Sequence, residues 1–237
     1  MILQKVFMRA GPDPDFPYLY EHDSFFYGDP EDWDGDIIGI GGNLSPGMLL
    51  SAYEQGIFPW YNPGDPVIWH SPDPRCVIFP GKLHISSSMQ KILKNRTFEI
   101  KFNTDFTGVI EACAQTKRSG QNGTWISNDI IAGYTELYRL GWAHSAEAWQ
   151  DGLLVGGCYG VSLGRAFFGE SMFSRKSNAS KAAFLSLAEL LFDNGLVFID
   201  CQVPTEHLLS LGGEELSRKN FLALLKKHRV SRHSLLP

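Results

Sequence analysis

A proline-rich junction, Ser71-Pro72-Asp73-Pro74-Arg75, separates two parts of this chain that differ in charge. Proline fixes the backbone φ angle and lacks an N–H donor, so neither a helix nor a central strand can run through this segment. Residues 1–77 carry twelve acidic and three basic side chains, a net charge of −9, whereas the remainder carries a net +4. We therefore expect a small N-terminal domain, 1–74, and a larger domain, 75–237, better suited to a polyanionic partner.

The acidic excess has a second interpretation, because most of it comes from the run between Asp13 and Asp36, which can be a solvated loop. From charge alone the two interpretations are equally supported. The segment from Gly11 to Gly42 is rich in turn-forming residues, with scattered aromatics and no sustained period. We expect it to be irregular, anchored by its aromatic side chains.

Composition places the chain among globular proteins, since 43% of its 237 residues are hydrophobic and 20% are charged. No apolar run approaches the roughly eighteen residues of a membrane span, and the start does not resemble a secretory signal. The cysteines are isolated, with no Cys-x-x-Cys pair, which is typical of structural thiols in a reducing compartment. We expect a cytoplasmic protein without a membrane span, in which the cysteines are structural rather than metal ligands. The four cysteines are Cys76, Cys113, Cys158 and Cys201.

Periodicity after the junction alternates between helix and strand. Helices are expected near residues 86–95, 105–115, 127–140, 178–194 and 217–232, after an earlier helix at 46–55. Strands are expected near residues 98–102, 142–149, 153–162, 165–170 and 196–202. Gln150-Asp151-Gly152 is a hairpin signal between two of these strands. The pattern predicts an α+β or α/β fold with a mixed sheet flanked by helices.

Asp200-Cys201-Gln202 follows a continuously apolar strand and is the strongest candidate for chemistry. Residues two apart on a strand share a face, so Asp200 and Gln202 should project together, opposite Cys201. A carboxylate at the end of a buried strand is unfavourable unless it is paired or used. Together the two side chains can hold an amine and remove its proton. The alternative is that Asp200 only caps a helix beginning near Pro204.

Two other segments are possible binding elements. The block from Phe168 to Arg175 mixes a strand end, large apolar side chains and Glu170, which suits a pocket floor able to take a cation. Gly169-Glu170-Ser171 is not a nucleophile elbow, because Phe173 stands where the second glycine would be. Asn178-Ala179-Ser180-Lys181 can be either an anion site at a helix start or a plain cap. No phosphate-binding glycine loop occurs in the sequence.

Ten ordered blocks carry a resemblance to a known family, and this resemblance covers roughly residues 37 to 213. They are GGNLSP (41–46), GIFPW (56–60), WHSPDPR (69–75), LHIS (83–86), GTWI (123–126), HSAE (144–147), GGCYG (156–160), GESMFSR (169–175), NASK (178–181) and DCQ (200–202). In this order they resemble the bacterial leucyl/phenylalanyl-tRNA–protein transferases. Asn43 and His70 depart from the family pattern, which usually has Asp and Trp at these positions.

The resemblance implies an aminoacyltransferase that moves Leu or Phe, and also Met, from aminoacyl-tRNA to an N-terminal Arg or Lys, marking the acceptor protein for degradation. It implies a GNAT-like acyltransferase domain and no cofactor, and we expect a monomer. By the same resemblance Asp200 and Gln202 would orient and deprotonate the acceptor amine, Glu170 would bind its cationic end, and Trp60 would stack near the terminal adenosine of the tRNA. The donor side chain would enter a pocket that includes Cys158, Phe167, Met172, Phe184 and Leu187.

Two other functions remain open at this point. A GNAT-like fold would also suit an acyl-CoA-dependent N-acetyltransferase, but the pyrophosphate loop of those enzymes has no counterpart in this sequence. A non-catalytic RNA- or peptide-binding module would not need Asp200 or Gln202. Basic side chains of the second domain are candidates for contacts with the tRNA backbone. They are Lys91, Lys94, Lys117 and Arg118, with the basic tail at 218–232 as a weaker candidate.

Overall fold

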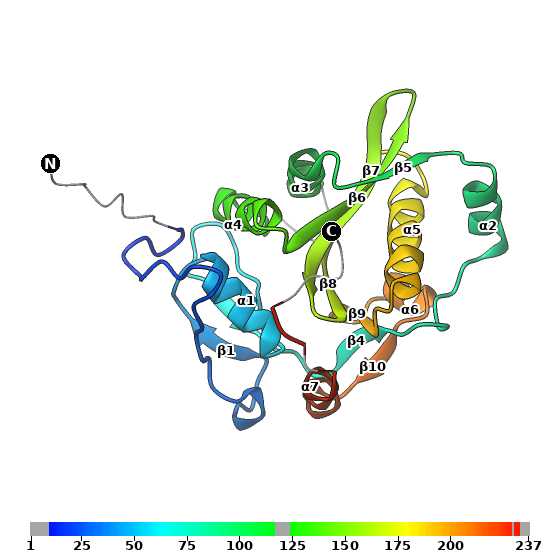
Figure 1. Cartoon of the computed structure of the whole chain (residues 1–237). Coiled ribbons are helices and arrows are strands. Elements are labelled where there is room, and N and C mark those ends of the chain that lie inside the picture. Colours follow the sequence, from blue (N-terminus) through cyan, green and yellow to red (C-terminus); the bar gives the residue numbers. More distant parts are fainter. Residues whose placement is uncertain (1–9, 117–123, 229, 233–237) are drawn as a thin grey trace, which may run out of the picture.

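The computed structural model describes residues 10–116, 124–228 and 230–232, which form a mixed α/β structure (Figure 1). Its helices are η1 (Pro30–Asp32, a 3-10 helix), α1 (Pro46–Glu54), α2 (Ser87–Lys94), α3 (Phe106–Gln115), α4 (Asn128–Arg139), α5 (Ala179–Asp193), α6 (Glu206–Ser210) and α7 (Arg218–Lys227). Its strands are β1 (Ile37–Ile40), β2 (Phe58–Pro59), β3 (Ile68–His70), β4 (Arg75–Ile78), β5 (Glu99–Phe102), β6 (Ala143–Gln150), β7 (Leu153–Leu163), β8 (Ala166–Ser174), β9 (Phe198–Gln202) and β10 (Glu214–Leu216). Within the described ranges, no helix combines the length and apolar character of a membrane span.

A seven-stranded sheet in the order β10-β4-β9-β8-β7-β6-β5 forms the centre of the molecule. All neighbours are antiparallel except β8 and β9, which are parallel. Helix α5 makes the crossover between these two strands, as a parallel connection requires. The sheet is therefore mixed, as the sequence pattern predicts.

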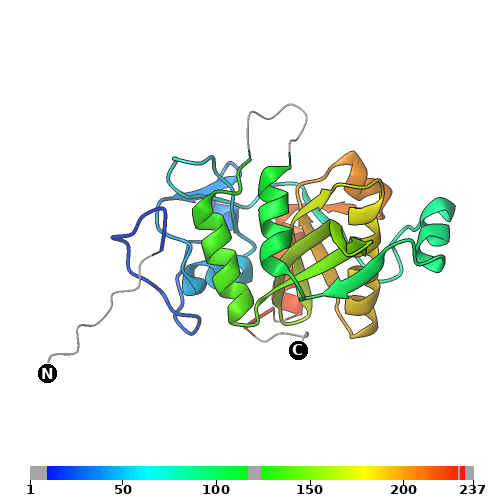
Figure 2. The same ribbon diagram turned by 90° about the horizontal axis from the view of Figure 1, so that it is seen from above.

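Helices cover both faces of this sheet, and each face has its own apolar core (Figure 1). Helix α5 lies along one face, where its alanine- and leucine-rich side packs with Met89 of α2. Helices α3 and α4 run side by side on the other face (Figure 2). Gly156 of β7 lets α5 approach closely, because a Cβ there would lie 2.5 Å from that of Ala179. This contact fixes the start of α5 against the sheet.

The N-terminal part adds a three-stranded sheet, β1-β3-β2, together with α1. The expectation that residues 11–42 are irregular is wrong at its end, where β1 pairs with β3. The apolar core on the α3–α4 side continues into this part through Leu49, Tyr53 and Trp69. The boundary between 74 and 75 stays a prediction, because one core spans it.

Most of the expected helices and strands are present, with boundaries shifted by a few residues. Ser86, Asp105 and Ser127 cap their helices by accepting a hydrogen bond from a backbone N–H three residues later. The tail helix is shorter than expected and ends at Lys227. Strands β4 and β10 were not expected. Both are short, and they matter because β4 lies directly beside β9.

Candidate active site

The site lies where the two parallel strands β8 and β9 separate. Their pairing runs from Ala166 opposite Phe198 to Phe168 opposite Asp200. Beyond that point β8 continues to Ser174, and its pairing with β7 shifts register so that Glu170 is an extra residue, a β-bulge. Bulges redirect side chains next to functional sites. Glu170 and Gln202 therefore come to stand across the gap between the two diverging strands.

A pocket of about 550 Å³ occupies this gap. One part of its wall is apolar and comes from β7, β8 and α5, on the side of the sheet that α5 covers. The other part brings polar groups from the bulge of β8, the end of β9 and α6. The lining residues are Phe58, Pro59, Trp60, Trp125, Cys158, Tyr159, Phe167, Gly169, Glu170, Ser171, Met172, Phe184, Cys201, Gln202, Val203, Thr205, His207 and Leu208. This is an apolar chamber with a few convergent polar groups, the usual form of a ligand site.

The Glu170 carboxyl group is hydrogen-bonded to two tyrosines, from α1 and α4, which lie on the face of the sheet opposite α5. The Tyr53 hydroxyl lies 2.7 Å from Oε1 and the Tyr134 hydroxyl 2.9 Å from Oε2, and the two hydroxyls are hydrogen-bonded to each other. Each of these three contacts needs one hydrogen, but the tyrosines supply only two. The short contact between the two hydroxyls therefore competes with the hydrogen bonds that both tyrosines donate to Glu170. A proton on Glu170 would supply the hydrogen that this arrangement lacks.

Burial is the main reason why Glu170 keeps a proton at unusually high pH. It raises the pKa of this carboxyl from 4.5 to about 7, against the lowering effect of the hydrogen bonds from Tyr53 and Tyr134. The nearby Asp200 carboxylate raises this pKa further, while Arg75 lowers it. A carboxyl group with a pKa near 7 can take and return a proton at neutral pH, which is what a general acid–base catalyst needs.

Asp200 is not on the pocket wall. Its side chain is fully buried, and Arg75 binds both carboxylate oxygens, Nε to Oδ1 at 2.8 Å and Nη2 to Oδ2 at 2.6 Å. The guanidinium carbon of Arg75 lies 4.8 Å from the centre of the Phe58 ring and 4.5 Å from the centre of the Phe221 ring. The alternative that Asp200 caps the next helix is wrong, because Thr205 caps α6. Asp200 is therefore paired, one of the two options expected for a carboxylate at the end of a buried strand.

Gln202 connects Asp200 to the pocket. Its backbone N–H donates to Oδ1 of Asp200 at 2.9 Å, and its side-chain Nε2 donates to Oε1 of Glu170 at 2.9 Å. Its backbone has a φ of +63°, a strained conformation for a residue other than glycine, and such outliers gather at functional sites. Cys201 packs into the core on the α5 side, opposite Asp200, as strand alternation predicts. A continuous chain of hydrogen bonds thus runs from Arg75 through Asp200 and Gln202 to Glu170.

Four of the five residues expected in the donor pocket line the apolar chamber, namely Cys158, Phe167, Met172 and Phe184. Leu187 does not: it is 1% exposed, in the same apolar cluster, and is absent from the wall. The α5 face that carries Phe184 reaches the chamber, but the next turn is already covered by neighbouring side chains. Leu187 therefore supports the wall from within the core.

The mouth of the pocket includes residues that the sequence pattern does not bring together. Trp60 is 42% exposed and lines the pocket, and its carbonyl group is 2.9 Å from Nε2 of His70. Trp125, Thr205 and His207 also line the pocket and were not expected to. Trp125 belongs to the GTWI block, so the motif was the only sequence signal for it. In the part of the chain that the structure describes, no cluster of three or more potential metal ligands occurs.

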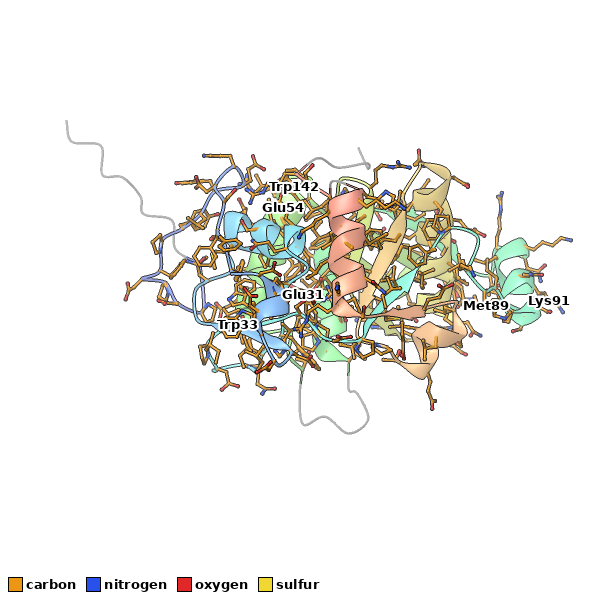
Figure 3. The ribbon with its side chains drawn as sticks, turned by 90° about the horizontal axis from the view of Figure 1, so that it is seen from below. Glu31, Trp33, Glu54, Met89, Lys91 and Trp142 are labelled. Atoms are coloured by element: carbon orange, nitrogen blue, oxygen red, sulfur yellow. The ribbon has the colours of Figure 1, made fainter. Side chains whose placement is uncertain are left out.

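The described basic residues proposed for tRNA contacts are not among those that line the pocket. Lys91 and Lys94 are exposed on α2, and Figure 3 shows Lys91 at the edge of the molecule. Lys226 and Lys227 are exposed at the end of α7. Lys117 and Arg118 fall outside the described residues. The role of all these side chains stays a prediction.

Comparison with known proteins gives consistent matches along the chain. A family model described as leucyl/phenylalanyl-tRNA protein transferase matches residues 77–226, and one described as the N-terminal domain of that protein matches residues 42–73. Among solved structures, a protein of unknown function from Bacteroides thetaiotaomicron is 12% identical, with a TM-score of 0.42 over 58% of this chain and 53% of its own.

Similar proteins of known name share about half of their residues with this chain. One from Nitratidesulfovibrio vulgaris (strain DP4) is 50% identical, covering 88% of this chain and 89% of its own. One from Aromatoleum aromaticum is 52% identical, covering 89% of this chain and 85% of its own. One from Flavobacterium johnsoniae is 50% identical, covering 88% of this chain and 98% of its own. All three are named leucyl/phenylalanyl-tRNA–protein transferase. Identity at this level over most of both chains, with a matching family model, shows that the chain belongs to the leucyl/phenylalanyl-tRNA–protein transferase family.

Proposed function

We propose that this protein transfers Leu or Phe from aminoacyl-tRNA to the N-terminal Arg or Lys of acceptor proteins. Family membership supports the reaction class, and one observation supports its location. A single pocket brings an apolar chamber next to the hydrogen-bonded pair Glu170 and Gln202. The chamber suits an apolar donor side chain, and the polar pair suits an amine. An aminoacyl ester is already activated, so the reaction needs only correct positioning and movement of a proton.

The donor side chain would occupy the chamber formed by Cys158, Phe167, Met172 and Phe184. These walls offer shape and apolar contact without a hydrogen-bond partner that could select one apolar side chain strictly. Such a pocket discriminates only weakly between side chains of similar size, so Leu, Phe and Met can all be accepted. The exposed ring of Trp60 at the mouth is available to stack on the terminal adenosine of the tRNA.

Glu170 is the group best placed to handle the proton of the acceptor. A free α-amino group has a pKa near 8, so at neutral pH it arrives mostly as an ammonium ion. This ammonium ion would first release its extra proton to water. An ionised Glu170 would then accept one N–H of the neutral amine and take that proton during the attack, while the amide oxygen of Gln202 would accept the other N–H. The amine nitrogen then attacks the ester carbonyl carbon, and the bond to the ribose oxygen breaks. Glu170 can return its proton to that oxygen as the tRNA leaves.

In this mechanism Asp200 is a positioning residue rather than the direct base. Both of its oxygens are engaged by Arg75, and one also accepts the N–H of Gln202. It would hold Gln202 in its strained conformation and direct the amide group towards Glu170 and the acceptor. The aminoacyl group therefore meets a preorganised set of donors and acceptors, which is the largest source of catalysis in many enzymes.

A GNAT-like catalytic domain remains part of the proposal. The parallel strands β8 and β9 with a site in the gap between them support it, because acyl transfer in such a gap brings donor and acceptor together from two sides. This arrangement also keeps acyl-CoA-dependent N-acetyltransfer as a second candidate. The monomeric state, the cytoplasmic location and the domain boundary between 74 and 75 remain predictions.

One assay separates these possibilities. Radiolabelled Phe-tRNA or acetyl-CoA is offered with a peptide that begins with Arg, and product is measured on the peptide. Transfer of Phe alone is expected, and the same peptide with an acetylated N-terminus should receive none. Transfer from acetyl-CoA would favour the N-acetyltransferase, and binding of both ligands without any product would favour a non-catalytic module.

A further inference from the structure

Cys201 lines the pocket and Cys76 lies on the neighbouring strand, and the proposed mechanism uses neither of them. Cys76 lies on β4 and Cys201 on β9, two antiparallel neighbours in which Ile78 is opposite Ile199. Cys76 is two residues from Ile78, and Cys201 is two residues from Ile199, so strand alternation puts both thiols on the face that α5 covers. The register shift next to Cys76 pairs it with Gln202, which leaves Cys201 adjacent to it.

The spacing of neighbouring strands suits a disulfide between these two residues. Adjacent strands lie about 4.8 Å apart, and a disulfide joins Cα atoms roughly 4.4 to 6.8 Å apart. Both thiols are free here, and the two side chains interact with each other. No change of strand pairing is needed to bring the two sulfur atoms together.

The two thiols differ in access. Cys76 is fully buried. A Cβ placed on Gly213 would lie 2.9 Å from the Cys76 sulfur, so the backbone at Gly213 closes one side of this thiol. Cys201 is partly exposed and lines the pocket. A small oxidant that enters the pocket therefore reaches Cys201 first, and Cys76 lies behind it. The contact between the two thiols lowers the pKa of Cys76 and, together with burial, raises that of Cys201, so the first thiolate of the pair forms at Cys76. A proton that passes from Cys201 to Cys76 places this thiolate at the accessible sulfur for the first step.

We propose that Cys76 and Cys201 form an oxidation site, at which a peroxide makes a reversible disulfide that disables the pocket. Cys201 first attacks hydrogen peroxide, which breaks the O–O bond and gives a sulfenic acid and one water. Cys76 then attacks the sulfur of Cys201 and displaces a second water. The two thiols together lose two electrons and two protons, and one peroxide is reduced to two waters.

The bond would disturb catalysis through Gln202. Drawing Cys201 towards β4 moves the next residue, whose backbone N–H and side-chain amide join Asp200 to Glu170. A displacement of about 1 Å at a reacting group can lower a rate by about a hundredfold. This consequence rests on the proposed function, whereas formation of the bond does not. Exposed or strained disulfides are the readily reduced ones, so the change should be reversible.

The four cysteines fall in four separate tryptic peptides, 76–82, 102–117, 140–165 and 182–218, which makes the bond directly measurable. The reduced full-length enzyme is treated with hydrogen peroxide, its remaining thiols are alkylated, and the digest is analysed by mass spectrometry without reduction. We expect a cross-link between peptides 76–82 and 182–218, with a loss of Phe transfer of at least about tenfold that dithiothreitol restores. Absence of this cross-link would overturn the proposal.

Cys76→Ala is the matched variant, because Cys76 lies outside the pocket wall. Its transfer activity should match that of the wild type before oxidation and should withstand peroxide. Equal loss in this variant, or a wild-type cross-link without loss of transfer, would overturn the role of the disulfide in activity. Transfer by the reduced wild type is measured first, so failure of the proposed function is seen separately from failure of the oxidation site.

Discussion

Arg75 and Asp200, 125 positions apart in the chain, form a fully buried ion pair in which two guanidinium nitrogens bind the two carboxylate oxygens. Removing one partner of a buried pair leaves an unpaired charge and costs about 3–5 kcal/mol. Asp200→Ala should therefore lower the free energy of unfolding by about this amount, measured by urea denaturation. It should also lower single-turnover transfer by about tenfold to a thousandfold, because Gln202 loses the acceptor of its backbone N–H.

A double-mutant cycle tests whether the two residues act as a pair. In Arg75→Met combined with Asp200→Ala, neither charge remains, so the loss of stability should be clearly smaller than the sum of the two single losses. Additive losses would mean that Arg75 and Asp200 contribute independently. Transfer by Asp200→Ala at the rate of the wild type would remove Asp200 from the mechanism altogether.

Glu170 should give the folded protein a characteristic dependence on pH. Its pKa is about 7 when folded and near 4.5 in the unfolded chain, so the folded state binds more protons between these values. The free energy of unfolding contributed by this group must therefore fall as pH rises from about 4.5 to about 7. Urea denaturation of the wild type and of Glu170→Gln across this range should show the difference. Parallel curves for the two proteins would contradict the raised pKa.

Transfer should respond to pH in the opposite direction. Only ionised Glu170 can take a proton, so kcat/KM should rise through pH 7, together with the contribution of the acceptor amine itself. Glu170→Gln should lose activity and retain only the rise due to the amine near pH 8. A profile for Glu170→Gln with the same shape as that of the wild type would assign both rises to the substrate.

The donor chamber can be tested through Cys158, a small buried residue on its wall. Cys158→Phe fills part of the chamber, and overpacking disfavours the larger ligand more strongly. Transfer of Phe should fall further than transfer of Leu when both charged tRNAs compete in one reaction. Cys158→Ala is the matched control, because it enlarges the chamber slightly and should spare Phe. Equal losses for both donors in Cys158→Phe would place this side chain outside the donor path.

The regular elements could largely be predicted because their signals are local. Ser86, Asp105 and Ser127 are caps that hydrogen-bond within their own helix turn, and Gly195 follows the end of α5. Strands β4 and β10 lack such signals. The first is four residues long and starts at Arg75, and the second is largely acidic, so only pairing with distant strands makes them part of the sheet.

For the site too, features with local sequence signals could be predicted and long-range contacts could not. Asp200, Gln202 and Glu170 stand out in sequence because polar residues follow apolar strands, and the family motifs contain all three. Their partners do not stand out, because Arg75 meets Asp200 only through the pairing of β4 with β9. The bulge that turns Glu170 towards Tyr53 and Tyr134 depends on register, which sequence patterns do not reveal. Sequence therefore indicated the polar residues at the pocket but not the hydrogen-bond network that surrounds them.

The exposed lysines of α2 allow a test of how the tRNA body is bound. With a net charge of −5, the protein can attract a polyanion only where its bases gather, and Lys91 and Lys94 are exposed together on one short helix. Replacing both lysines by Glu should weaken the binding of tRNA. It should also reduce the slope of log affinity against log salt concentration, by a little under one for each phosphate that the protein no longer neutralises. Affinity is measured across a salt series, with binding of free aminoacyl-adenosine as a control that should not change. The same replacement at Lys117 with Arg118 and at Lys226 with Lys227 completes the comparison. If none of the three pairs alters affinity or slope, tRNA recognition depends on the aminoacyl-adenosine end at Trp60 rather than on these charges.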